Sequence, residues 1–286
     1  MAGSTTSAIE VIGRGHPWLS LAPALCVIAV LFGGGLVLGL AGSFGMGRGD
    51  AGLDAWIAVL SEGRVWRSLG LSLWIAFAST ALSCVIGLGA ALLLRRRFPG
   101  QGMARLLFQI NLTIPHAVGA LGILWLLSQS GFLARLSAGA GLIDGPAGFP
   151  ALTQDRFAIG IIAHYVWKEV PFIGLILLAN MQSLGDDPES AARSLGASPF
   201  GAMRLVLLPL LWPALIRAGA IVFAFSFGAW EVPVLLGQSA PTALPVLAWQ
   251  RFTDPDLAAR PEAMAIAMLI ALVSAVLIRA AFAGRE

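Results

Sequence analysis

The sequence predicts an all-α membrane protein with six transmembrane helices, both termini in the cytoplasm, and short cytoplasmic helices between spans four and five. Composition, charge-free stretches and an uneven distribution of arginine predict this fold class. Of the 286 residues, 58% are apolar and 12% are charged, and the mean hydropathy is +0.85. Soluble domains are about a quarter charged, and folding leaves roughly a quarter of a chain's surface exposed. Much of this apolar surface must therefore face lipid.

The spans follow from the gaps between charges, because a helix crossing about 30 Å of hydrocarbon needs about 20 apolar residues. They are predicted at Leu19–Leu40, Ser68–Leu94, Leu106–Ser128, Phe157–Ser183, Arg217–Gly237 and Ala263–Phe282. The last span is long enough only if Glu262 and Arg279 extend their charged groups to the membrane surface. The first exceeds the apolar core of a signal peptide, about 7–15 residues, and is interpreted as an uncleaved anchor.

The orientation follows from the excess of arginine that cytoplasmic segments carry. Arg95, Arg96 and Arg97 directly follow the second span, and Arg105 is close behind. We therefore expect residues 1–18 to form a cytoplasmic N-terminal segment. The loop at Leu184–Pro209 and the C-terminus are predicted to lie on the same side.

Several function classes are excluded by the residues themselves. Lys168 is the only lysine and is followed by Glu169, so the chain has no P-loop with which to bind ATP. The G-x-G-D string at Gly47–Asp50 resembles that of aspartyl intramembrane proteases, but no other aspartate lies in a predicted span. Cys26 and Cys84 lie in apolar stretches, no Cys/His cluster has metal-ligand spacing, and no basic run suits nucleic acid.

The loop between spans four and five predicts two short helices. Asp187 is a suitable N-cap, Pro188 suits the first helical position, and Glu189 suits the positive end of the helix dipole. Gly196 can end this helix in the left-handed conformation. Ser198 then repeats the cap before a second helix.

The second helix would start at Pro199, and Pro209 and Pro213 would mark the start of span five. The small face formed by Ala191, Ala192 and Leu195 suits close contact with another protein. An amphipathic hairpin resting on lipid headgroups is the other interpretation.

This stretch resembles the EAA loop of permease subunits of binding-protein-dependent ABC importers, E-A-A-x(3)-G-x(9)-I-x-L-P. The matching positions are Ala191, Ala192, Gly196, Val206 (in place of isoleucine), Leu208 and Pro209. The family's acid position holds Ser190, with Glu189 one residue earlier, so either residue could take the acid's role. The residues that the resemblance assigns to contact with an ATPase are Glu189, Ser190, Ala191, Ala192, Arg193, Gly196, Ser198 and Pro209.

Shorter matches resemble the branch that imports polyamines, iron, sulfate or thiamine: Trp167–Phe172, Gly228–Pro233 and Leu244–Leu247. The resemblance implies that residues 19–286 form a six-span permease domain with a coupling loop at 184–209. It implies a second permease, identical or not, two ATPase subunits that bind ATP and Mg²⁺, and an external solute-binding protein. The chain itself would be no enzyme, would bind no cofactor, metal or nucleic acid, and would lie in the lipid of a bacterial cytoplasmic membrane.

Three charges fall inside predicted spans, where each costs about 2–3 kcal/mol or more: Lys168, Glu169 and Glu231. Lys168 could pair with either acid and merely fix packing. Alternatively, these charges with Trp167 and Trp230 line a path for a small polar or cationic solute such as a polyamine, since ammonium groups bind over aromatic faces.

The remaining polar and proline residues of the spans have simpler interpretations. Pro171 and Pro233 are expected to break or kink their helices and free carbonyls for the path. His164 and Asn180 are expected to be packing residues. A secondary transporter or channel, which needs no ATPase, is the main alternative function.

Overall fold

The computed structural model describes residues 17–46, 51–96 and 98–283, and every regular element in these ranges is helical. Outside them lie Arg14, Arg97, the string Gly47–Asp50 and nearly all of the predicted segment 1–18. The elements are α2 (Pro17–Ile28), η2 (Ala29–Gly33), α3 (Gly34–Ser43), α4 (Asp54–Ser61), α5 (Gly63–Leu94), α6 (Gln101–Ile110), η3 (Asn111–Thr113), α7 (His116–Leu127), α8 (Phe132–Gly139), η4 (Pro146–Gly148), α9 (Ile159–Leu184), α10 (Asp187–Ser194), α11 (Pro199–Ala202), η5 (Met203–Leu207), α12 (Leu208–Gly228), α13 (Glu231–Leu236), α14 (Leu244–Phe252), η6 (Leu257–Ala259) and α15 (Arg260–Phe282).

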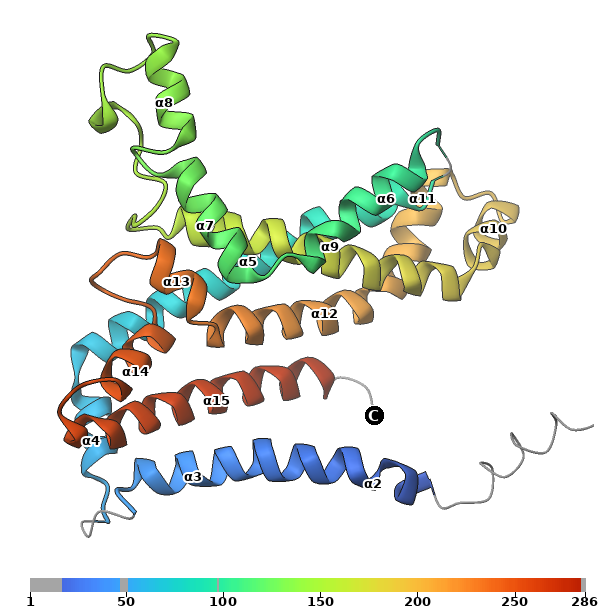
Figure 1. Ribbon diagram of the computed structural model, residues 1–286. Coiled ribbons are helices and arrows are strands. Elements are labelled where there is room, and N and C mark those ends of the chain that lie inside the picture. Colours follow the sequence, from blue (N-terminus) through green and yellow to red (C-terminus); the bar gives the residue numbers. More distant parts are fainter. Residues whose placement is uncertain (1–16, 47–50, 97, 284–286) are drawn as a thin grey trace, which may run out of the picture.

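The described residues contain six helices long and apolar enough to span a membrane, as the sequence predicts. They are Leu21–Ser43, Gly63–Leu94, His116–Gly139, Ile159–Leu184, Pro199–Gly228 and Leu257–Phe282. The chain is therefore a multi-pass membrane protein. Helix α2 begins and α15 ends toward the end of the molecule where α10 lies, while α4 and α14 lie at the opposite end (Figure 1).

Helices α5, α9 and α12 form the centre of the bundle, with α15 and then α3 packed below them (Figure 1). Most buried residues of α5 are small: Ser68, Ser72, Ala76, Ser79, Ser83, Gly87 and Ala91, beside the larger Val65, Ile75 and Leu94. Small residues let two helices approach closely in a membrane. At Gly87 an added Cβ would lie 3.1 Å from Ile173 Cβ and 3.2 Å from the Val170 carbonyl oxygen of α9.

The third span differs from its prediction. The expected helix Leu106–Ser128 is interrupted, because α6 ends at Ile110 and α7 starts at His116. Pro115 lacks an N–H and disfavours helical backbone at the preceding residue, and Ile114 is indeed extended. The candidate span then runs from His116 to Gly139, through the short bend between α7 and α8.

The fifth span was also placed wrongly, by about nine residues at each end. Helix α12 begins at Leu208, carries Arg217 in its interior and ends at Gly228. It starts without a break, because α11 runs into it through the π-helical η5. Pro209 lies in its first turn, as predicted, whereas Pro213 lies inside the helix. The backbone is extended at Ala229, four residues before Pro233, and Glu231 therefore begins the separate helix α13.

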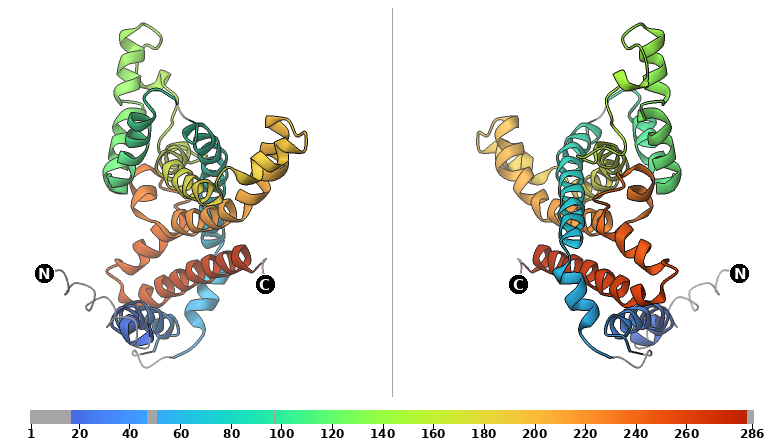
Figure 2. Two further views of the ribbon diagram at one scale, coloured as in Figure 1. Left: turned by 90° about the vertical axis from the view of Figure 1, so that its right-hand side faces the viewer. Right: turned by 90° about the vertical axis from the view of Figure 1, so that its left-hand side faces the viewer.

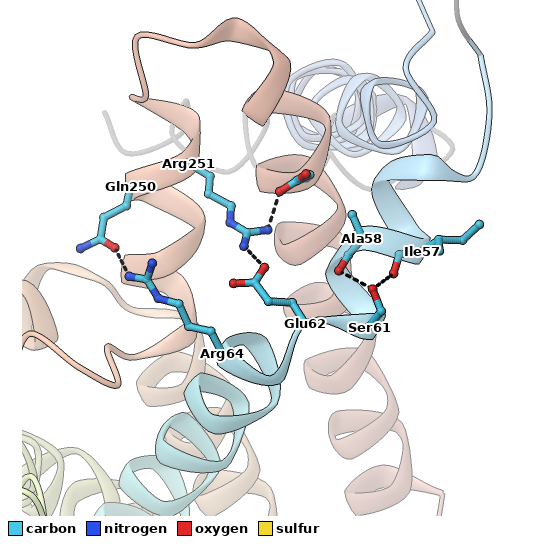
Figure 3. Close-up of polar contacts among 8 residues, drawn as sticks. Ile57, Ala58, Ser61, Glu62, Arg64, Gln250 and Arg251 are labelled. Carbon is cyan, nitrogen blue, oxygen red and sulfur yellow. Dashed lines mark hydrogen bonds and ion pairs between the residues drawn. The ribbon is translucent and has the colours of Figure 1, made fainter.

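The end opposite α10 is held by an ion-pair network (Figure 3). Arg251 of α14 donates to Glu62, which precedes α5, and, at 2.7 Å, to Glu262 of α15. Arg64 donates to the side-chain oxygen of Gln250 at 3.2 Å. Glu262, expected to reach the membrane surface, is thus engaged with the protein instead, and α15 starts at Arg260, one turn earlier than predicted.

Candidate functional site

Helix α10 stands out from the bundle between α9 and α11 (Figures 1 and 2). It begins at Asp187, so the flanking residue is Asp186, and the prediction of Asp187 as N-cap is wrong by one residue. The Asp186 side chain makes no capping hydrogen bond. Asp187 and Glu189 instead contribute their charge to the first turn, where the helix dipole favours it, and Pro188 lies there without loss of a bond.

The predicted turn after α10 is confirmed. Gly196 has a φ of 92°, in the left-handed region, and its N–H donates to the Arg193 carbonyl at 2.9 Å. The Ser198 hydroxyl then accepts a hydrogen bond of 3.0 Å from the Gly201 N–H and caps α11. The second predicted helix thus starts where expected, although it continues into α12.

Glu189 and Ser190, the two candidates for the family's acid, lie in opposite environments. Glu189 is 8% exposed, and both of its carboxylate oxygens accept from one guanidinium nitrogen of Arg95, at 3.0 and 3.1 Å. Arg95 is the residue that ends α5. Ser190 is exposed. Only Ser190 is therefore open to a partner in this structure.

The other predicted contact residues divide in the same way. Ala191, Arg193 and Gly196 are exposed, as is Leu195 at 89%, whereas Ala192 is half-buried. Pro209 is exposed but belongs to α12 and lines an apolar hollow with Trp212, apart from α10.

A polar hollow of about 530 Å³ lies beside α10, between it and the ends of α5 and α9. Arg95, Arg96, Arg105 and Arg193 line it, together with Asp186 and Glu189. Arg105 also donates to the Leu94 carbonyl at 3.1 Å, and Gln101 donates to the same oxygen at 2.8 Å. These two bonds cap the C-terminus of α5, whose last carbonyls have no helical partner.

Inside the spans, Lys168 forms no ion pair with any carboxylate in the ranges that the structure covers, so its predicted pairing with Glu169 or Glu231 is wrong. Its Nζ donates at 2.7 Å to the carbonyl oxygens of Asn111 and Ile114, and the side chain is only 3% exposed. The Asn111 carbonyl also accepts from the Ile114 N–H at 3.2 Å, whereas the break before α7 leaves the Ile114 carbonyl without a helical partner, which would be costly in hydrocarbon. Lys168 therefore stabilises the helix break.

Pro171 neither breaks α9 nor leaves a carbonyl free. The helix is continuous from Ile159 to Leu184, and the carbonyl four residues before Pro171, that of Trp167, accepts from the Asn111 side-chain amide. Asn111 replaces the helical N–H that Pro171 lacks. The prediction that this carbonyl lines a path is therefore wrong.

The predicted packing residues His164 and Asn180 differ in whether their side-chain nitrogens have hydrogen-bond partners. Asn180 donates to the Ile176 carbonyl at 3.0 Å. His164 Nε2 lies 3.4 Å from His116 Nδ1, but its own Nδ1 has no hydrogen-bond partner. His164 belongs to a group of rings from α7, α9 and α12: His116, His164, Tyr165, Trp167 and Phe225.

Three of the predicted solute-path residues, Trp167, Lys168 and Glu169, are consecutive in α9, and Lys168 Nζ lies 5.9 Å from the Trp167 ring centroid, whereas Trp230 lies elsewhere. Glu169 is buried in α9, the helix that also carries three residues of the ring group. Trp230 stacks on Trp249, with ring centroids 4.9 Å apart, and lines an apolar groove of about 530 Å³ between α3, α14 and α15. Glu231 does not line this groove, so Glu231 and Trp230 share no cavity here.

No group of three or more His, Cys, Asp or Glu side chains suited to a metal ion occurs among the described residues. Arg95 as a partner of α10, and Asn111 as a partner of the carbonyl that Pro171 leaves without a helical N–H, were not predicted from the sequence. The only sequence signal for Asn111 is a polar residue four positions before a proline in an apolar run.

Residues 83–285 match the family model described as "Binding-protein-dependent transport system inner membrane component". The chain belongs to this family. Its members are permease components of ABC importers, so the resemblance of the EAA loop pointed to the correct family. The chain is 27% identical over 272 residues to the trehalose/maltose transport system permease protein MalF of Thermococcus litoralis, covering 90% of each chain.

A second relative is the thiamine transport system permease protein ThiP of Brucella abortus (strain 2308), 29% identical over 217 residues. That match covers 75% of this chain but only 37% of the relative. The fold is similar to that of a bacterial ABC transporter for import of the acidic polysaccharide alginate, with a TM-score of 0.76, 16% identity and 96% coverage of both chains. It also resembles the MetNI methionine ABC transporter, with a TM-score of 0.52, 20% identity and coverage of 77% and 99%.

Proposed function

We propose that this chain forms one half of the solute path of an ABC importer and couples that path to ATP hydrolysis by a separate ATPase subunit. ATP and Mg²⁺ bind to the ATPase, since this chain has no P-loop. The proposal rests on the family and on one structural observation. Helix α10 presents Ser190, Ala191 and Arg193 to the outside and lies between two glycines with left-handed backbone, Gly185 and Gly196.

The assembly comprises two ATPases, a second permease, identical or not, and an external solute-binding protein, in the inner membrane of a bacterium. The family description, with its binding protein and inner membrane, supports this arrangement. The excess of arginine near α10 supports a cytoplasmic position for α10 and both termini. Co-purification of an ATPase with the tagged full chain separates this function from a secondary transporter or channel.

Coupling predicts that changes at the α10 turn separate ATP hydrolysis from uptake. Gly196→Pro removes the left-handed turn and the N–H bond to Arg193, and Ala192→Trp places bulk on a half-buried side of α10. Both variants should insert into the membrane but lose uptake while ATP hydrolysis continues. The ratio of solute transported to ATP hydrolysed, measured in vesicles, checks this.

The matched control is Gly141→Pro. Gly141 also has a left-handed backbone after a helix, with a φ of 70°, and its N–H donates to the Ala138 carbonyl at 3.0 Å. It follows α8 (Phe132–Gly139), a helix that lies far from α10 (Figure 1). This variant should keep the parent ratio. Normal transport by both α10 variants would exclude the coupling role.

For the solute, we propose a small polar or cationic molecule such as a polyamine. The partly buried Glu231, which forms no ion pair with any other described residue, is the acid available to a cation. The relatives include permeases named for trehalose/maltose and for thiamine, so the test compares uptake of an uncharged polar solute with uptake of a cation. Glu231→Gln should lower uptake of spermidine more than uptake of trehalose. Unchanged spermidine uptake would reject the cation site.

A further inference from the structure

The Arg95–Glu189 ion pair joins the end of α5 to α10, two elements separated by 94 positions in the sequence. We propose that this pair clamps α10 to α5, so that the two helices move as one body when a partner displaces α10. The proposal rests on the proposed coupling function and names two positioning residues for it.

The connections of α10 along the chain cannot fix its orientation by themselves. Gly185, with a φ of 66°, separates it from α9, and Gly196, with a φ of 92°, separates it from α11. Neither glycine has an atom within 4 Å of the position of an added Cβ, so no neighbouring element packs against that side of either turn. A third point of attachment is therefore needed.

Apolar packing does not provide that third point. Glu189 is the one buried residue of α10, and Pro188 and Ala192 are half-buried. The buried cluster at this end of the bundle is made by α5, α9, η5 and α12 and contains no residue of α10. Charge-assisted hydrogen bonds are stronger than neutral ones, and those from Arg95 hold the buried residue of α10 to the end of α5.

The other half of the clamp is fixed. Arg95 directly follows the 32-residue α5, whose last carbonyls are held by Gln101 and Arg105. Helix α5 also packs against α9, most closely at Gly87, which lies against Ile173 and Val170. A displacement of Glu189 therefore reaches a helix of about 48 Å that extends to the opposite end of the bundle.

The clamp also gives a reason why the acid of the loop is Glu189, one residue before the family's acid position. An acid bonded to its own chain is not free for an ATPase, and the exposed position next to it holds Ser190. In this chain the acid of the loop serves attachment within the subunit, and the surface of α10 serves contact with the partner.

The test measures the distance between α5 and α10 directly. Spin labels are placed at Val85→Cys on the exposed side of α5 and at Ser194→Cys on α10, with Cys26 and Cys84 replaced by alanine. The complex in lipid nanodiscs is measured by pulsed electron resonance without nucleotide and after trapping with ATP and vanadate. The parent should give one narrow distance that is the same in both states.

Arg95→Gln and Glu189→Gln should each broaden the distribution without nucleotide and let it shift on trapping. The charge exchange Arg95→Glu with Glu189→Arg should restore the narrow distance, which a general loss of stability would not allow. Glu62→Gln, which removes an ion pair at the opposite end of α5, is the matched control and should behave as the parent (Figure 3).

Narrow distributions in both single variants, a parent distance that changes on trapping, or an exchange variant that stays broad would each overturn the clamp. The nucleotide-free comparison needs no ATPase. If no ATPase accompanies the chain, the proposed function fails while the clamp is still tested.

Discussion

Asn111 carries a specific role at the residue scale, since its amide supplies the hydrogen that Pro171 cannot supply to the Trp167 carbonyl. An unpaired buried carbonyl costs about 1–3 kcal/mol, so Asn111→Ala should destabilise the parent protein. In a Pro171→Ala background the helix itself supplies the N–H, and the same change should cost less. The expected coupling energy between the two sites is about 1 kcal/mol.

Thermal unfolding of the four proteins of this cycle in detergent gives the coupling energy. Asn180→Ala is the matched control, because Asn180 also donates to a carbonyl of α9, but to one with a helical N–H available. Its effect should be the same with and without Pro171. Additive effects of Asn111→Ala and Pro171→Ala would show that Asn111 does not replace the missing N–H.

How far single residues could be predicted depended on what they contact. Gly196 and Ser198 follow local rules of turn and cap, and the structure confirms both. Lys168 was expected to be held by the protein, but its partners were wrong. They are backbone carbonyls at a helix break that charge spacing does not reveal.

At the scale of elements, close packing of α5 on α9 depends on the absence of a side chain at Gly87. Gly87→Leu would force a side chain against Ile173 and the Val170 carbonyl. Overpacking of this kind costs about 1–3 kcal/mol, so the unfolding temperature should fall. Gly89→Leu, two residues along the same helix, is the control, because an added Cβ there meets nothing within 4 Å. Equal unfolding temperatures for both variants would contradict this packing.

Element boundaries were predicted well where a span lies between clear charges and poorly where proline interrupts it. The second and fourth spans end within two residues of their predicted ends, at Leu94 and Leu184. The third span and the end of the fifth failed because apolar length alone does not show that Pro115 and Pro233 divide a stretch. The start of the fifth failed because Arg217 lies inside α12 and not at its boundary. The clamp could not be predicted either, since Arg95 and Glu189 meet only in the folded bundle.

For the whole molecule, the first span remains almost unburied and packs mainly on α15 (Figure 1). Its outer face is therefore available to lipid or to a second permease. The α10 surface, at the other side of the bundle, is the part that the proposed function assigns to an ATPase. Both surfaces, the outer face of the first span and the exposed side of α10, are open to a partner when the chain is considered alone.

The most direct test of the ATPase assignment is site-specific photo-crosslinking in cells. A photoreactive residue at Leu195, which is 89% exposed beside α10, should form an adduct with an ATP-binding subunit, identified by mass spectrometry. The same residue at Leu142, 76% exposed beyond α8, should form none. Adducts at Leu195 with lipid or an extracytoplasmic protein, and none with an ATPase, would contradict the account.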